Sequence, residues 1–340
     1  MTCTLFQQPA NSRPLRKVVV IGLAVFCGWS WASVPSSAQP QVAASDSLNA
    51  AGPIQLRNLP LDEVALEALK RAVTARDYVK AEALLGDALK KEPTSSRLLA
   101  SLGKIFFLDG KYDRSATALK EAEDHGSLDE AGRFTLAMAD VVLGHYSEAK
   151  PELEALVRQY PRTARYHYWL SRIDYSEFHY TSAISEAKEA LQLDAKFTRA
   201  HEQLGLCYEA LEQNDLAIQS FMNAVTLNHS AKHPSPQPPL SLGALLFKLN
   251  RLQEAETYFR EALLYDPRFS RAYFQLGMVL EKEGKDSEAI QQLRRAVSLD
   301  SSYAEAHYVL GRVLERSGLE DEARSEFASF EKMKKAEPSK

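Results

Sequence analysis

The chain has 340 residues, of which 45% are hydrophobic and 25% are charged, and this is the composition of an ordered globular protein. The formal charge is only −4 and no long run of Lys and Arg occurs, which excludes nucleic acid as the main partner. The length permits two ordinary domains or one long repeat array.

Residues 1–38 have the layout of a secretory signal peptide. Basic side chains precede an apolar stretch at 18–32 that is short for a membrane-spanning helix, and small residues follow it. Cleavage is expected after Ala38, with cleavage after Ala32 and an uncleaved membrane anchor as the alternatives. The sequence therefore predicts an exported protein, periplasmic or secreted. Contact with a membrane is expected only through this segment, if it stays uncleaved.

Residues 39–60 are rich in Ala, Ser, Asn and Gln, contain two Pro, and are predicted to form a flexible lead-in. After cleavage Cys207 is the one cysteine left, so the fold cannot rely on an internal disulfide. Cys207 lies in a helical apolar pattern, which indicates a small buried hydrophobic residue.

From residue 61 onward the same residue classes recur at a fixed spacing. Eight units begin at residues 62, 96, 130, 164, 198, 236, 270 and 304. The step is 34 residues except between units five and six, where it is 38, and the four extra residues coincide with the sequence HSAKHPSPQPP. Positions are numbered below from the first residue of each unit.

The recurring positions predict two packed helices per unit. Position 7 is Leu in seven units, position 20 is Ala or Ser in all eight, and position 24 is large and apolar in every unit except at Ala187. Positions 4, 7, 8 and 11 share one helical face, and positions 20, 24 and 27 share another. Position 8 is Gly in five units, so we expect the two backbones to approach closely there while the side chain at position 24 fills the space beside them.

Turn residues mark the ends of both helices. Gly or Asn at position 15 is expected to end the first helix, and Pro at position 32 to end the second. The residues at position 15 are Gly110, Gly144, Asn250, Gly284 and Gly318, and those at position 32 are Pro93, Pro161 and Pro267. One pair cannot bury its apolar face alone, so the copies must stack.

This 34-residue pattern resembles the tetratricopeptide repeat family over about residues 61–335. The resemblance implies an all-α fold, a right-handed superhelical solenoid of about eight helix-turn-helix units. Units one to five would occupy 61–231, the Pro-rich insertion and units six to eight 232–335, and a tail 336–340. Arg133 and Pro239 stand at position 4, where the family often has Trp, so the helix starts of units three and six are the hardest to place.

The resemblance also implies that positions 2, 5, 9, 12 and 13 of the first helices face a concave groove that binds a partner. The aromatic and sulfur-containing side chains at these positions are Phe107, Phe134, Met138, Tyr168, Tyr175, Phe247, Phe274, Met278 and Tyr308. The basic side chains there are Arg97, Lys104, Arg165, Arg172, Arg199, Arg271 and Arg312. A cationic groove in an acidic protein favours a protein or peptide partner, acidic in character. The alternative is that these aromatic rings pack between units, beneath the Arg stems.

No pattern for catalysis, a cofactor or a metal is found. His167, His201 and His307 all fall at position 4, which favours packing within a unit. His229 and His233 have a metal-ligand spacing, but they lie in the Pro-rich insertion, where a helix is not expected. Neither a phosphate-binding loop nor a nucleophile elbow is present in the sequence.

These observations predict a non-enzymatic scaffold that binds a protein in its groove and helps to assemble an envelope complex. The alternative is a structural array that self-associates into homo-oligomers through its end surfaces. Phe327 and Phe330 lie where a further unit would cover them, so either the tail at 331–340 folds over them or they form that contact surface.

Overall fold

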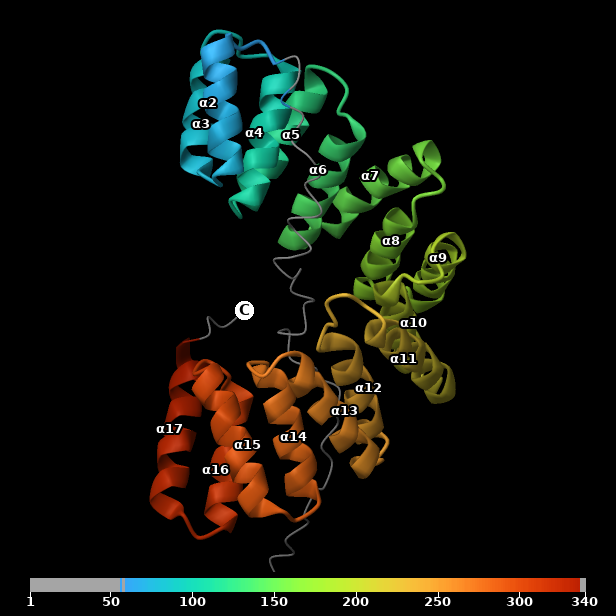
Figure 1. The fold of residues 1–340 in the computed structure, drawn as a ribbon, viewed down its shortest axis with the longest axis vertical. Helices are drawn as coiled ribbons and strands as arrows, with labels where there is room; N and C mark the ends of the chain where they lie inside the picture. Colours follow the sequence, from blue (N-terminus) through green and yellow to red (C-terminus); the bar gives the residue numbers. More distant parts are fainter. Residues whose placement is uncertain (1–55, 57–58, 337–340) are drawn as a thin grey trace, which may run out of the picture. The chain divides into compact units, whose positions relative to one another are not determined.

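The computed structural model describes residue 56 and residues 59–336, so the expected signal segment lies outside the described residues. Within this part the chain forms sixteen helices and no strand (Figure 1). The helices are α2 Glu63–Thr74, α3 Tyr78–Leu89, α4 Ser96–Leu108, α5 Tyr112–Asp124, α6 Glu130–Leu143, α7 Tyr146–Gln159, α8 Ala164–Ser176, α9 Tyr180–Leu193, α10 Thr198–Ala210, α11 Asn214–His229, α12 Gln237–Lys248, α13 Leu252–Tyr265, α14 Ser270–Lys282, α15 Asp286–Leu299, α16 Ala304–Arg316 and α17 Glu320–Ala336.

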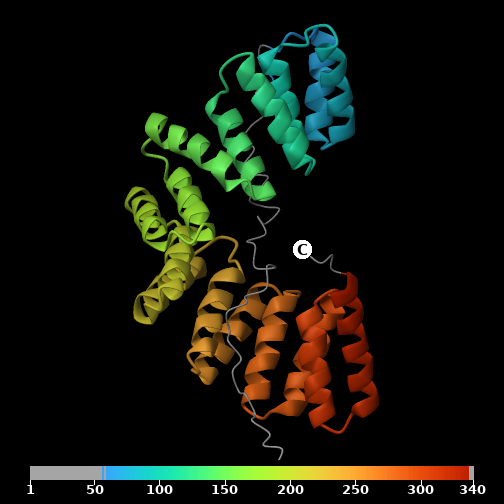
Figure 2. The ribbon, with the colours of Figure 1, turned by 180° about the vertical axis from the view of Figure 1, so that it is seen from behind.

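Consecutive helices pack as antiparallel pairs, from α2 with α3 to α16 with α17 (Figures 1 and 2). The second helix of each pair also contacts the first helix of the next pair, and α8, α10, α12, α14 and α16 touch one another in that order. The eight pairs coincide with the eight sequence units. The predicted all-α repeat solenoid is therefore confirmed.

The predicted close approach inside a unit occurs between positions 8 and 24. A Cβ atom added to Gly205 would lie 2.7 Å from the ring of Phe221, which is closer than carbon atoms pack. The same conflict, at 2.6 to 2.8 Å, would arise at the other four position-8 glycines, Gly103, Gly243, Gly277 and Gly311. Position 8 therefore has to be small wherever position 24 carries Phe and in two of the units that carry Leu.

Unit four reaches the same packing with the sizes reversed. Ser171 stands at position 8, and position 24 carries the small Ala187. The Ser171 hydroxyl is buried and donates a hydrogen bond to the Ala183 carbonyl oxygen at 2.7 Å. In unit four the position-8 side chain of the first helix therefore contacts the second helix. In the units with Gly at position 8, the large position-24 side chain of the second helix contacts the first helix instead.

The turn between the two helices has the same backbone conformation in all eight units. Position 15 has a positive φ of 57° to 78° in every unit. The sequence predicted a helix end at the five Gly and Asn residues, and Arg76, Phe178 and Glu212 adopt the same conformation without such a signal. The left-handed conformation is costly for residues with a Cβ atom. The packing of the two helices that flank the turn therefore imposes the left-handed conformation at position 15.

The two difficult helix starts are both settled by local chemistry. Asp129 caps α6 by accepting a hydrogen bond from the Gly132 N–H at 2.7 Å. In α12, Pro238 and Pro239 lie in the first turn, where backbone N–H groups have no partner within the helix and proline loses nothing.

The Pro-rich insertion is closed by one buried side chain. Asn228 donates to the Ser235 carbonyl oxygen and accepts from the Ser235 N–H, both at 2.8 Å. The helix preceding it extends further than expected, because His229 is the last residue of α11. The expectation that His229 lies outside a helix is therefore wrong.

Buried apolar side chains form three clusters along the described part of the chain. Leu59 is buried in the first cluster and Leu56 packs against it, so the packed part of the chain begins before residue 61. Among the described residues no helix is both long and apolar enough to span a membrane.

The position-8 contact can be tested with a pair of Gly→Ala variants. Gly205→Ala is expected to lower stability by about 1–3 kcal/mol, because the added methyl group collides with the Phe221 ring. Gly86→Ala in α3 is the control, since nothing lies within 4 Å of its Cβ position, and it is expected to be neutral or to stabilise the helix by up to about 1 kcal/mol. Thermal unfolding followed by circular dichroism compares the two, and equal effects would contradict the close approach.

Candidate partner-binding surface

The residues predicted to face a groove differ widely in exposure. Buried residues in this set are Phe107, Phe134, Met138, Tyr168, Phe274, Lys104 and Arg172. Partly buried ones are Arg165, Tyr175, Arg199, Phe247 and Met278, and exposed ones are Arg97, Arg271, Tyr308 and Arg312. The buried aromatic residues fit the alternative expectation, in which the rings pack between units. The surface that a partner can reach is therefore smaller than the sequence suggested.

Arginine stems cover several of these rings. The Arg165 guanidinium lies 4.7 Å from the centre of the Phe134 ring, in the preceding unit. Arg172 lies 4.5 Å from the centre of the Trp169 ring, and Arg312 lies 5.9 Å from that of Tyr308. Such cation–π contacts fix the basic side chains against their own helices and the adjacent unit.

Carboxylates of the same unit or of the preceding one balance much of the positive charge. Arg165 donates to Glu130 at 3.1 Å, and Lys104 donates to Asp129 at 3.0 Å. Glu130 also accepts from the Tyr166 hydroxyl, and burial is the largest cause that raises the pKa of Tyr166 to about 12. The hydroxyl therefore remains a donor at neutral pH.

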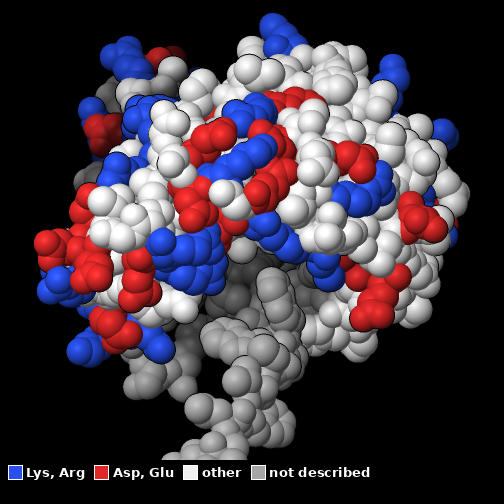
Figure 3. Space-filling view, turned by 90° about the horizontal axis from the view of Figure 1, so that it is seen from below, with Lys and Arg blue, Asp and Glu red and all other residues white. Residues whose placement is uncertain are grey.

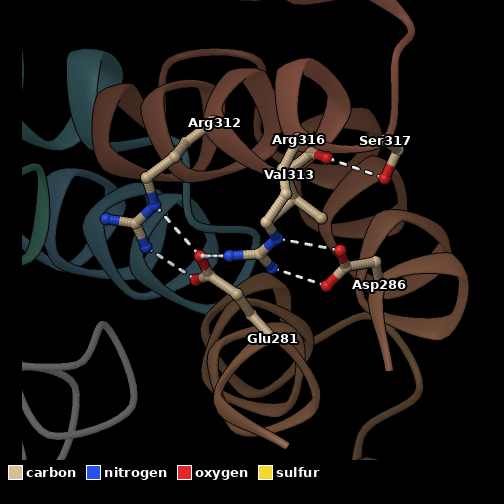
Figure 4. A network of polar contacts seen from close by, with 6 residues as sticks. All are labelled: Glu281, Asp286, Arg312, Val313, Arg316 and Ser317. Atoms are coloured by element: carbon tan, nitrogen blue, oxygen red, sulfur yellow. Dashed lines mark hydrogen bonds and ion pairs between the residues drawn. The ribbon is translucent and has the colours of Figure 1, made fainter. Parts of the chain in front are cut away.

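A larger charge network joins units seven and eight (Figure 4). The Glu281 carboxylate accepts from Arg312 at 2.6 Å and from Arg316 at 3.3 Å, and Arg316 also donates to Asp286 at 2.5 Å. Position 12 of one unit thus meets positions 9 and 13 of the next. The same relation between positions 12 and 13 joins Glu209 to Lys248 at 3.2 Å.

The face seen in Figure 3 carries Lys and Arg interleaved with Asp and Glu, and no broad area of one sign. The sequence pattern indicated the basic residues but not their carboxylate partners, Asp129, Glu130 and Glu281. Aligning position 12 of each unit with positions 9 and 13 of the next would have found Glu281, together with the pair of Glu209 and Lys248. Around Lys104, Arg165 and Arg312, the surface predicted to be cationic therefore consists of paired charges.

Two of the three position-4 histidines contact the second helix of their own unit. His167 contacts Glu186 at 2.8 Å, and His307 contacts Glu326 in the same way. Both carboxylates stand at position 23, as does Glu152, which accepts from Arg133 at 2.6 Å. Position 4 thus links the two helices of a unit by a polar contact in units three, four and eight.

A second contact ties position 4 to the connection from the preceding unit. Side chains of His201, Tyr273 and His307 reach the backbone carbonyl oxygens of residues 195, 267 and 301, at 3.1 to 3.3 Å. These carbonyl groups all belong to position 32. In the Pro-rich region, His229 contacts Glu261 of the next unit at 2.7 Å.

Cys207 is fully buried, as expected. Burial is the main cause that raises the pKa of its thiol to about 11, so the thiol is protonated at neutral pH and is a poor nucleophile. This agrees with a packing role for Cys207.

Thiol chemistry provides a direct check on this environment. In a Cys3→Ser/Cys27→Ser variant, the thiolate fraction of Cys207 at pH 8 should be roughly a hundredfold below that of a thiol with a pKa of 9.0, and burial slows access further. The native chain should therefore react slowly with Ellman's reagent and fast once unfolded. Equal rates in the two states would contradict the buried position.

Comparison with known proteins gives a family match and structural matches. Residues 66–130, 134–176, 240–304 and 287–336 match one family model described as tetratricopeptide repeat, and residues 198–229 match a second model with the same description. No curated protein matched the chain.

Solved structures resemble this fold, and two of them match most of this chain. A tetratricopeptide repeat protein from Parabacteroides merdae is 17% identical with a TM-score of 0.62, and the match covers 74% of this chain and 98% of that protein. A chain of the APC/C hetero-tetramer Cut9-Hcn1 is 16% identical with a TM-score of 0.58, covering 77% of this chain and 51% of that one. At these identities the likeness concerns the fold.

Proposed function

Because the chain belongs to the tetratricopeptide repeat family, whose members bind peptides or proteins and are typically non-catalytic scaffolds, we propose that it holds a partner protein against the first helices of its units. The observation that carries this proposal is a set of side chains on α14 and α16 that are aromatic, sulfur-containing or basic and are exposed or, for the sulfur-containing one, partly exposed. Arg271, Met278, Tyr308 and Arg312 make up this C-terminal surface.

The C-terminal surface has the composition of an interaction site. Tyr308 is 38% exposed, and its ring lies 5.2 Å from that of Phe330 and 6.0 Å from that of Phe327. Tyrosine and arginine dominate interface energies, because they bring large contact areas together with hydrogen-bond donors. A Tyr held by two further rings loses little freedom on binding.

Ion pairs on this surface change the kind of partner that it is expected to bind. Since Arg312 already contacts Glu281, a partner has to present both acceptors and donors to match the surface. An acidic peptide remains favoured only near Arg271, where the sequence-based expectation of an acidic partner still applies.

The phenylalanines at the last unit give the self-association alternative less support. Phe327 fills the space next to Gly311, and Phe330 packs against Tyr308, so both rings are used within unit eight. Self-association through this end remains the second candidate, and it is separable by experiment.

The groove proposal is tested by pull-down from cell-envelope extract with the full chain. A Arg271→Glu/Tyr308→Ala variant should lose a protein that the unaltered chain retains, because truncation of an interface anchor costs about 2 kcal/mol or more, roughly 30-fold in Kd. The matched control is Arg260→Glu/Leu264→Ala on α13, with one exposed basic and one exposed apolar side chain outside the first helices.

Retention of the same proteins by all three chains would reject the C-terminal surface as the binding site. Light scattering of the same purified chains measures their molar mass and so tests the self-association alternative. A mass that rises with concentration and falls in a Phe330→Ser variant would favour that alternative over a groove-bound partner.

The proposed setting is an exported complex of the cell envelope, and it rests on the sequence of residues 1–38. Fractionation of cells followed by N-terminal sequencing is expected to recover a chain beginning at residue 39 outside the cytoplasm. A full-length chain in the cytoplasmic fraction would contradict export.

A further inference from the structure

Two consecutive units carry an acid where the repeat otherwise places an apolar core residue. Position 11 is buried in every unit. It is Ala72, Phe106, Tyr208, Leu246, Leu280 and Leu314 in six units, and Asp140 and Asp174 in units three and four. In these two units alone position 16 is histidine, His145 and His179. The Asp and His therefore recur together.

The turn between α6 and α7 brings three ligand-type side chains of unit three together. Asp140 lies in the last turn of α6, and the His145 N–H donates to the Asp140 carbonyl oxygen at 2.8 Å across the left-handed Gly144. Glu148 follows in the first turn of α7. One side-chain ligand atom from each of Asp140, His145 and Glu148 lies within 4.8 Å of the others.

Asp140 is buried with its carboxylate unsatisfied. The residue is 1% exposed, and neither carboxylate oxygen has a hydrogen-bond partner in the described part of the protein. Lys120 Nζ lies 3.7 Å from Oδ1 and His145 Nδ1 lies 3.6 Å from it, both beyond hydrogen-bond distance. A buried carboxylate without hydrogen bonds is costly, and coordination to a cation is one way to offset that cost.

The Lys120 ammonium is a cation next to these ligands. It reaches from α5 of the preceding unit, pairs with the Glu148 carboxylate and faces Asp140. Its side chain is 45% exposed on a flexible stem, so it can withdraw into solvent without any change in the helices. The cluster thus already accommodates one positive charge.

We infer that Asp140, His145 and Glu148 bind one divalent first-row transition-metal cation, with zinc as the representative, in place of the Lys120 ammonium. One imidazole nitrogen and two carboxylate oxygens suit this class of ion, because imidazole favours zinc, copper and nickel over magnesium and calcium. The sequence alone predicted no metal site, because neither Asp140 nor Glu148 belongs to a histidine or cysteine motif.

Unit four provides an internal comparison. Asp174, Glu177 and His179 form a similar cluster, but Asp174 accepts a hydrogen bond from Lys150 at 2.5 Å. Its buried carboxylate is therefore satisfied by the protein itself, and a cation gains less there. The first cluster is expected to bind zinc and the second to bind it much more weakly.

The test is calorimetric titration of zinc chloride into the full chain with any affinity tag removed. One equivalent is expected to bind. Outer-shell changes alone alter metal affinity about 10–100-fold, so loss of a direct ligand in His145→Gln should weaken binding by at least about tenfold. Lys120→Gln should strengthen it, because the competing charge is removed, and His179→Gln should leave it unchanged.

A further variant guards against loss of folding. Asp140→Leu places at position 11 the residue found there in units six to eight, so it should fold, as checked by circular dichroism, and bind no zinc at this site. The inference is overturned if neither the unaltered chain nor Lys120→Gln binds zinc. It is also overturned if binding survives in both His145→Gln and Asp140→Leu, or is lost in His179→Gln instead.

Discussion

The contact between positions 8 and 24 is the constraint on which the other features depend. Where position 8 is Gly, the side chain at position 24 lies against the backbone of the first helix, and the two helix axes come close. Position 20, on the same face of the second helix, is Ala or Ser in every unit, and the turn has to reverse the chain within a few residues. This packing makes one unit, and its repetition makes the core continuous.

The repeat could be recognised in the sequence because helix packing restricts the size of the residue at each buried position, and these positions recur at a fixed spacing. Gly and Asn at position 15 and Pro at position 32 predicted where helices end, and α13, for example, ends two residues before Pro267. The sequence could not show that Arg76, Phe178 and Glu212 take the same left-handed turn, because these residues avoid it in isolation. That conformation is a product of the assembled pair.

The candidate surface was less predictable for a similar reason. Position numbers placed the basic and aromatic residues on the first helices, but exposure depends on the adjacent unit. Phe134, for example, is covered by Arg165 from unit four, and Arg312 is held by Glu281 from unit seven. A contact between residues of adjacent units can be predicted only if the positions in both units are aligned. The residues of one unit considered alone do not reveal it.

The loop between α11 and α12 shows how the array accommodates additional residues. Asn228 closes the loop on Ser235 from inside, so the longer connection is absorbed locally while α12 still packs on α11 and α13. Chain length between units can therefore vary, provided that the helical faces keep their internal spacing. The period of the sequence is thus a property of the packing faces, and such connections are the places where an evolving repeat protein can acquire new segments without altering its core.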